Sequence, residues 1–162
     1  MDTLRGVIER VGIDPAKLAL EITETIFRGG REEAQSRLKE LKSLGVSLVV
    51  DDFGTGYSSL DSFATSSFDA LKVDRSFVRD VTTNFRHRAI VRTITGFAED
   101  LGLRLIAEGI ETEDQANLLR ELGCTLAQGD LYAAAMSVEQ METLLEAGLH
   151  VRGEALSDGA VA

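Results

Sequence analysis

The sequence predicts an α/β fold in which about five parallel strands alternate with helices. Five short apolar runs of strand length are separated by longer stretches whose apolar residues have helical spacing. Three of these helical stretches end at a glycine just ahead of the next apolar run. In addition, polar residues recur where the apolar runs end. A parallel α/β fold, whether a barrel or an open sheet, collects its chemistry at those ends.

The candidate strands are short runs dominated by Leu, Ile, Val and Ala, which is typical of strands buried in a parallel sheet. In chain order they are LALEI (18–22), SLVVD (47–51), DALKV (69–73), LRLIAE (103–108) and CTLAQG (124–129).

The candidate helices are REEAQSRLKELKSLG (31–45), HRAIVRTITGFAEDLG (87–102) and TEDQANLLRELG (112–123). In the first of them Leu38, Leu41 and Leu44 fall on one face, as in a helix that packs on a sheet. We expect a single domain over residues 1–148. Residues 149–162 lose the periodicity, and we expect a disordered C-terminal tail there.

Composition limits the classes of function. The 162 residues are 44% hydrophobic and 27% charged, as in a globular domain with one core. A net charge of -10 disfavours nucleic acid and anionic membranes as partners, so a phosphate-bearing ligand would need added cations. The single cysteine, Cys124, excludes an internal disulfide, and no run is long enough for a signal peptide or a membrane span. We therefore expect a cytoplasmic protein.

Charged and amide side chains mark the ends of all five apolar runs. They are Glu21, Asp51, Asp52, Lys72, Glu108 and Gln128. Each has a structural explanation when taken singly, since an acid can cap the next helix and a lysine can be a solvated charge. Taken together they predict a site, because clustered carboxylates repel one another unless cations lie between them.

Carboxylates without His or Cys favour Mg²⁺, Mn²⁺ or Ca²⁺ over zinc. The adjacent pair Asp51 and Asp52 can bridge one metal and reach a second, an arrangement suited to phosphodiester hydrolysis. Lys72 would add a positive charge for a phosphate or a metal-bound hydroxide. Glu108 would ligate metal or accept a proton, with Glu111 as a supporting carboxylate.

Five motifs in this chain resemble, in order, those of the EAL family, the phosphodiesterases that linearise cyclic di-GMP. They are EITET (21–25), DDFGTGYSSL (51–60), LKVDRSF (71–77), AEGIET (107–112) and QG (128–129). The resemblance implies a partial TIM-type (β/α) barrel. It also implies cyclic di-GMP as the ligand, linear pGpG as the product, and a two-metal site for Mg²⁺ or Mn²⁺.

The resemblance also assigns roles to residues. The implied metal ligands are Glu21, Asp51, Asp52 and Glu108. The implied catalytic set is Lys72, Glu108, Glu111 and Gln128. Asp51 would be shared by both metals, and Glu108 would bind the second metal or act as general base. Glu24 would brace the glycine-rich loop that follows the aspartate pair.

The chain departs from the family pattern in two places. The Glu-Ala-Leu motif and an asparagine from the next strand are absent, which indicates an N-terminally truncated domain that is inactive alone. Such a domain would need a complementing N-terminal segment or a second copy of the chain. The second departure is QGDLYAAAMS (128–137), where the family tends to have an aromatic residue and later a proline. Two alternatives stay open: a degenerate module that binds cyclic di-GMP or a protein without catalysis, and a gene fragment without activity.

Overall fold

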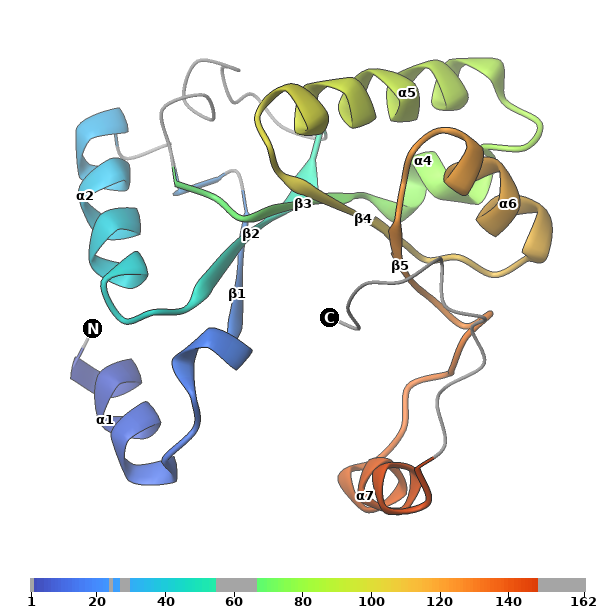
Figure 1. Cartoon of the computed structure of the whole chain (residues 1–162). Coiled ribbons are helices and arrows are strands. Elements are labelled where there is room, and N and C mark those ends of the chain that lie inside the picture. The colour runs from blue at the N-terminus through green and yellow to red at the C-terminus, as the bar shows by residue number, and fades with distance from the viewer. Residues whose placement is uncertain (1, 24, 27–29, 55–66, 149–162) are drawn as a thin grey trace.

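The computed structural model describes residues 2–23, 25–26, 30–54 and 67–148 (Figure 1). It contains one sheet of five parallel strands in the order β1-β2-β3-β4-β5. The strands are β1 (Ala19–Thr23), β2 (Ser47–Phe53), β3 (Ala70–Val73), β4 (Arg104–Glu108) and β5 (Leu126–Gln128). The predicted fold of five parallel strands alternating with helices is thereby confirmed. The predicted tail, 149–162, lies outside the described residues.

Helices lie between β1 and β2, between β3 and β4, between β4 and β5, and at both ends of the described chain. They are α1 (Asp2–Val11), the short 3-10 helix η1 (Pro15–Lys17), α2 (Arg31–Lys42), α4 (Arg75–Arg79), α5 (Phe85–Asp100), α6 (Glu113–Glu121) and α7 (Val138–Glu146). The predicted glycine stops after α2, α5 and α6 are confirmed. Gly45, Gly102 and Gly123 have φ of 86°, 66° and 96°, values that end a helix and cost glycine little. Within the described segments, no helix is long and apolar enough to cross a membrane.

The register of the strands gives the sheet one apolar face and one polar face. Glu21 pairs with Val49, Lys72 with Ile106, and Glu108 with Gln128. Because alternate residues of a strand share a face, one face carries the ionisable groups and the other carries the residues between them. The apolar face consists of Leu48, Val50, Leu71, Val73, Leu105 and Ala107.

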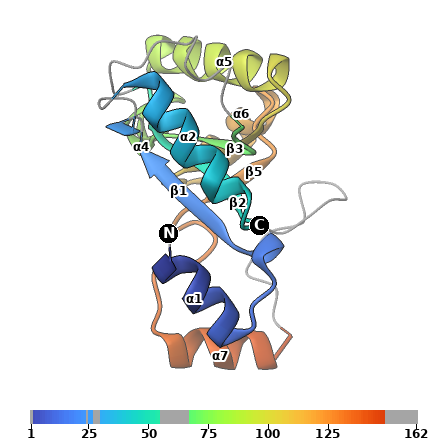
Figure 2. The same cartoon turned by 90° about the vertical axis from the view of Figure 1, so that its left-hand side faces the viewer.

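The apolar face forms the core together with three helices. Helices α2, α5 and α6 contribute Ala34, Leu38, Val91, Ile94, Ala98, Ala116 and Leu119, all of them buried. In Figure 1 α5 lies above the sheet, with α2 to its left and α6 to its right, whereas α1 and α7 lie at the bottom of both views (Figures 1 and 2). The covering helices therefore fix the strands from the apolar side and leave the polar face for the site.

An ion pair stabilises the amino-terminal end of the strands. Asp69, just before β3, accepts hydrogen bonds from Lys42 Nζ at 2.7 and 2.8 Å and from the backbone nitrogen of Leu48 at 2.7 Å. Since Lys42 is the last residue of α2 and Leu48 is the second residue of β2, one carboxylate connects a helix to two strands.

We expect Asp69→Ala to lower the free energy of unfolding by about 2 to 4 kcal/mol, because it leaves a half-buried ammonium and a backbone N–H without their acceptor. Urea denaturation measures this loss. Arg37→Met is the control, since it removes only the exposed pair of Arg37 with Glu33 and should cost less than about 0.5 kcal/mol. Equal losses in the two variants would contradict the role of Asp69.

Candidate active site

Lys72 is the centre of the site. Its side chain extends from β3 on the polar face and is only 4% exposed. The ammonium nitrogen lies 2.7 Å from Glu21 Oε1 on β1, 3.4 Å from Asp51 Oδ1 on β2 and 2.5 Å from Glu108 Oε1 on β4. Four neighbouring strands thus bring one cation and three carboxylates to the same point.

The fifth strand joins this cluster through Gln128. Its amide Nε2 donates a hydrogen bond to Glu108 Oε1 at 2.6 Å, which gives that oxygen a second donor beside Lys72. Glu108 is therefore held in a fixed orientation from both sides. Because carboxylate hydrogen bonds to charged donors are the stronger ones, Lys72 contributes more to this orientation than Gln128 does.

The cluster shifts the proton affinities of its members. Burial acts to lower the pKa of Lys72, but the hydrogen bonds to Glu108 and Glu21 and the charges of Glu108 and Asp51 outweigh it, so the pKa lies above its ordinary value. The ammonium is therefore retained. For Glu108, burial is the largest influence and raises the pKa, the Lys72 contacts oppose it, and the charges of Asp51 and Glu21 add to the rise. The raised pKa makes the Glu108 carboxylate a better proton acceptor than an ordinary glutamate.

An irregularity in β2 separates Asp51 from Asp52. The register to β3 shifts between Val50 and Phe53, and Asp52 has φ 56°, a left-handed conformation that few residues other than glycine adopt. Asp51 consequently stays on the polar face. Phe53 turns instead into the core, where its ring stacks on Phe97 with centroids 5.6 Å apart. Asp52 lies between them, exposed, and its backbone nitrogen donates to Asp51 Oδ1 at 3.1 Å.

The structure brings together five of the predicted site residues: Glu21, Asp51, Lys72, Glu108 and Gln128. Asp52 occupies the exposed bulge position next to them. Glu111 lies on the loop after β4, where it lines a neighbouring cavity. Glu24 lies outside the described residues, as does most of the glycine-rich loop that it was predicted to brace.

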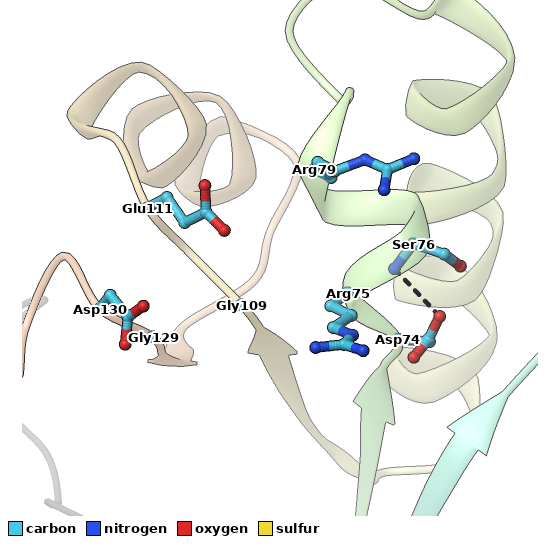
Figure 3. Close-up of a pocket in the computed structure, with 8 residues that line it drawn as sticks. All are labelled: Asp74, Arg75, Ser76, Arg79, Gly109, Glu111, Gly129 and Asp130. Carbon is cyan, nitrogen blue, oxygen red and sulfur yellow. Dashed lines mark hydrogen bonds between the residues drawn. The ribbon is translucent and has the colours of Figure 1, made fainter. Parts of the chain in front are cut away.

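The neighbouring cavity has a volume of about 770 Å³ and opens between α4 and the loops that follow β4 and β5 (Figure 3). Its lining carries both signs of charge, with Arg75 and Arg79 on α4 and Glu111 and Asp130 on the two loops. Asp130 belongs to the stretch in which the chain departs from the family pattern. The sequence alone did not single out the two arginines, because RSFVR is too short to show helical periodicity.

The donor set fits a hard divalent cation in its chemistry. Three carboxylate oxygens already surround one positive charge, and oxygen ligands of this kind suit Mg²⁺, Mn²⁺ and Ca²⁺. As placed, however, no group of three or more His, Cys, Asp or Glu side chains in the described segments is arranged to hold a metal ion. The carboxylates are directed to the Lys72 ammonium, and they would have to turn from it to bind a metal.

Comparison with known proteins identifies the family. The family model described as EAL domain matches residues 1–135. The chain belongs to the EAL domain family. The resemblance inferred from the five motifs is thereby confirmed, and the parallel sheet with its alternating helices is the corresponding part of the TIM-like fold of that family.

Relatives of this EAL domain chain include proteins with named activities. It is 40% identical over 147 residues to the "Cyclic di-GMP phosphodiesterase NbdA" of Pseudomonas aeruginosa, covering 91% of this chain and 19% of NbdA. The EAL domain of Mycobacterium smegmatis DcpA superposes with a TM-score of 0.85 at 38% identity, covering 91% of this chain and 66% of that one. A manganese and cyclic di-GMP complex of Klebsiella pneumoniae BlrP1 gives a TM-score of 0.74 at 34% identity, with coverages of 81% and 33%.

The chain spans about a fifth of the length of the curated relatives that it matches, such as the 19% of NbdA and 17% of a protein from Sinorhizobium fredii. The activity, substrates and partners of the whole protein are therefore matters for proposal.

Proposed function

We propose that the chain binds cyclic di-GMP together with divalent cations, and that a domain built on it hydrolyses this ligand to linear pGpG. The observation that supports the proposal best is the convergence of Glu21, Asp51 and Glu108 on Lys72 at the polar face of an EAL sheet. A phosphodiester is an anion, and an acidic chain of net charge -10 can bind one only where cations offset its carboxylates. The Mn²⁺ and cyclic di-GMP complex of BlrP1, a protein of similar fold, agrees with this chemistry.

In the proposed site each residue has its own role. Glu21, Asp51 and Asp52 would hold two Mg²⁺ or Mn²⁺ ions, with Asp51 shared between them. Such ions, when bound, favour deprotonation of water and stabilise charge on the leaving oxygen. Glu108 would bind the second ion or accept the proton of the attacking water, and Gln128 would keep Glu108 oriented. Lys72 would offset the negative charge of the phosphate once the carboxylates have turned to the metals.

The 162 residues taken alone should bind cyclic di-GMP more readily than they hydrolyse it. Mg²⁺ requires near-octahedral geometry from fixed ligands, and the described carboxylates are not arranged as such a set. We therefore propose that catalysis needs further metal ligands, supplied by a complementing segment or a second copy of the chain.

A non-catalytic binding module is the second candidate function, favoured by Asp130 in the cavity lining where the family tends to have an aromatic residue. Hydrolysis of cyclic di-GMP distinguishes the catalytic domain from the non-catalytic module.

The test is calorimetric titration of the chain with cyclic di-GMP, with and without Mn²⁺, followed by chromatography for linear pGpG. We expect binding that requires Mn²⁺ and weakens at least about tenfold in Asp51→Asn, because that change removes one of the converging carboxylates. Glu33→Gln is the control, since Glu33 is an exposed residue of α2 and should not affect binding. No binding with any divalent metal, or equal affinity in Asp51→Asn, would refute the proposal.

A further inference from the structure

Gln115, in the first turn of α6, is a buried polar side chain outside the predicted site. Its side chain is only 5% exposed, and both ends of its amide are engaged. The oxygen Oε1 accepts hydrogen bonds from the backbone nitrogens of Glu111 at 2.8 Å and Thr112 at 3.0 Å. The nitrogen Nε2 donates to the backbone carbonyl of Arg79 at 3.0 Å. One side chain therefore links the loop after β4 to the last residue of α4, 36 positions away.

These contacts go beyond what the start of a helix requires. In a capping box, the side chain at the fourth position bonds the backbone nitrogen of the cap residue, here Thr112. Helix α7 has the same box, in which Gln140 accepts from the backbone nitrogen of Ser137 at 2.8 Å. Gln140 is exposed, whereas Gln115 is buried and makes two more hydrogen bonds, to Glu111 and to Arg79. The additional bonds join two walls of the cavity in Figure 3.

The other side of the same loop is fixed by backbone contacts. Ile110 donates from its nitrogen to the carbonyl of Gln128 at 3.1 Å and accepts at its carbonyl from Leu131 at 3.0 Å. At Gly109 an added Cβ would lie 2.7 Å from Cβ of Arg75, so α4 packs directly on the loop. Ile110 thus fixes the loop to the end of β5. Gln115 is the side chain that fixes its other side, next to Glu111, to α4.

We propose that Gln115 is a positioning residue of the site: it holds the backbone of Glu111 against α4, and so sets where the Glu111 carboxylate stands in the cavity wall. Its importance for a ligand rests on the proposed function. The set of three hydrogen bonds made by Gln115, here called the Gln115 clamp, does not depend on a ligand. It makes Glu111 part of a rigid wall although Glu111 lies on a loop. Glu111 is thereby placed by a residue four positions further along the chain.

Three variants separate the parts of this clamp. Gln115→Met keeps the buried volume and removes all three hydrogen bonds. Gln115→Glu keeps an acceptor for Glu111 and Thr112 but loses the donor to Arg79. Gln140→Met is the matched control, because it removes the same box interaction from α7 without touching this loop. Amide hydrogen exchange followed by NMR reports on each position.

In Gln115→Met the Glu111 amide should exchange about tenfold faster or more, measured against amides of core residues such as Leu105 of β4, since its acceptor is lost. In Gln115→Glu that amide should stay protected. The amide of Val81, which closes the end of α4 by bonding Val78, should exchange faster in both variants because both lose the bond to Arg79. Gln140→Met should leave both amides unchanged. An unchanged Glu111 amide in Gln115→Met, or an equal acceleration in Gln115→Glu, would overturn the proposal.

Ligand binding completes the test. With Mn²⁺ present, and at a temperature at which all the variants are folded, Gln115→Met should bind cyclic di-GMP about tenfold more weakly, while Gln140→Met should bind as the wild type does. Equal affinity of Gln115→Met and wild type would overturn the positioning role. If the wild type binds no dinucleotide, the proposed function fails, and the exchange pattern still decides whether Gln115 holds Glu111.

Discussion

Lys72→Met should destabilise the metal-free protein strongly and, at the same time, make it respond more to Mn²⁺. We expect the free energy of unfolding to fall by about 3 kcal/mol without metal, the range seen when one partner of a buried ion pair is removed. The reason is that Lys72 is 4% exposed and offsets three carboxylates. Glu21, 52% exposed, can turn to water, but Asp51 and Glu108, at 23% and 15%, remain near each other without a cation.

Mn²⁺ should then restore more stability to Lys72→Met than it adds to the wild type. In the wild type the ammonium and the metal compete for the same oxygens, so part of the metal's binding energy is spent on breaking the Lys72 ion pairs. In the variant the carboxylates have no competing cation. Stabilisation by a ligand grows with its concentration relative to its dissociation constant, so tighter Mn²⁺ binding appears as a larger shift in the unfolding curve.

Lys42→Met is the control for this experiment. It also removes a half-buried lysine from a carboxylate, but at the amino-terminal end of the strands, where Asp69 is the only partner with a side-chain carboxylate among the residues described. It should lose stability without gaining any response to Mn²⁺. The measurement is urea unfolding of the three proteins in EDTA and in millimolar Mn²⁺. If Mn²⁺ stabilises Lys72→Met no more than the wild type, Lys72 does not occupy the place of the metal.

The existence of the strands could be predicted because burial of a parallel sheet demands apolar runs, and each predicted run contains most of an observed strand. The boundaries were less accurate. The run SLVVD stops at Asp51, whereas β2 continues to Phe53 through the bulge at Asp52. Its hydrophobic pattern gives no sign of that extra residue, because the reason for it is the fit of Phe53 against Phe97 from a distant helix.

The composition of the site could also be predicted, since carboxyl ends of parallel strands meet along one edge. The ion pairs that these residues form with one another could not be predicted. We expected Lys72 to serve a phosphate or a metal-bound hydroxide, and the structure shows it inside the carboxylate cluster. That arrangement depends on the register between strands, which the sequence leaves open. Gln115 was missed altogether, although the pattern Thr112-x-x-Gln115 is a sequence signal for a capping box.

Gly129→Ala is the second change for which we expect a large effect, and it acts through packing. Gly129 follows the site residue Gln128, and an added Cβ would overlap the backbone nitrogen and oxygen of Ile110 and lie 2.8 Å from its carbonyl carbon. Ile110 cannot yield easily, because its side chain is buried and both of these backbone atoms are hydrogen-bonded. The conformation adds to the cost, since φ at Gly129 is 156°. We expect a loss of at least about 3 kcal/mol, enough to unfold a domain of ordinary stability in part.

Two other glycine substitutions separate the effect of the steric overlap with Ile110 from the effect of the backbone conformation. Gly102→Ala places a side chain at φ 66° with no atom within 4 Å, so it should cost about 1 to 2 kcal/mol from the left-handed conformation alone. Gly96→Ala, inside α5 and equally free of neighbours, should stabilise by up to about 1 kcal/mol through helix propensity. Urea unfolding ranks the three. A loss at Gly129 no larger than at Gly102 would mean that the end of β5 can move away from Ile110. In that case the loop carrying Glu111 would be held by Gln115 on one side only, and Gln115→Met would be the more damaging change.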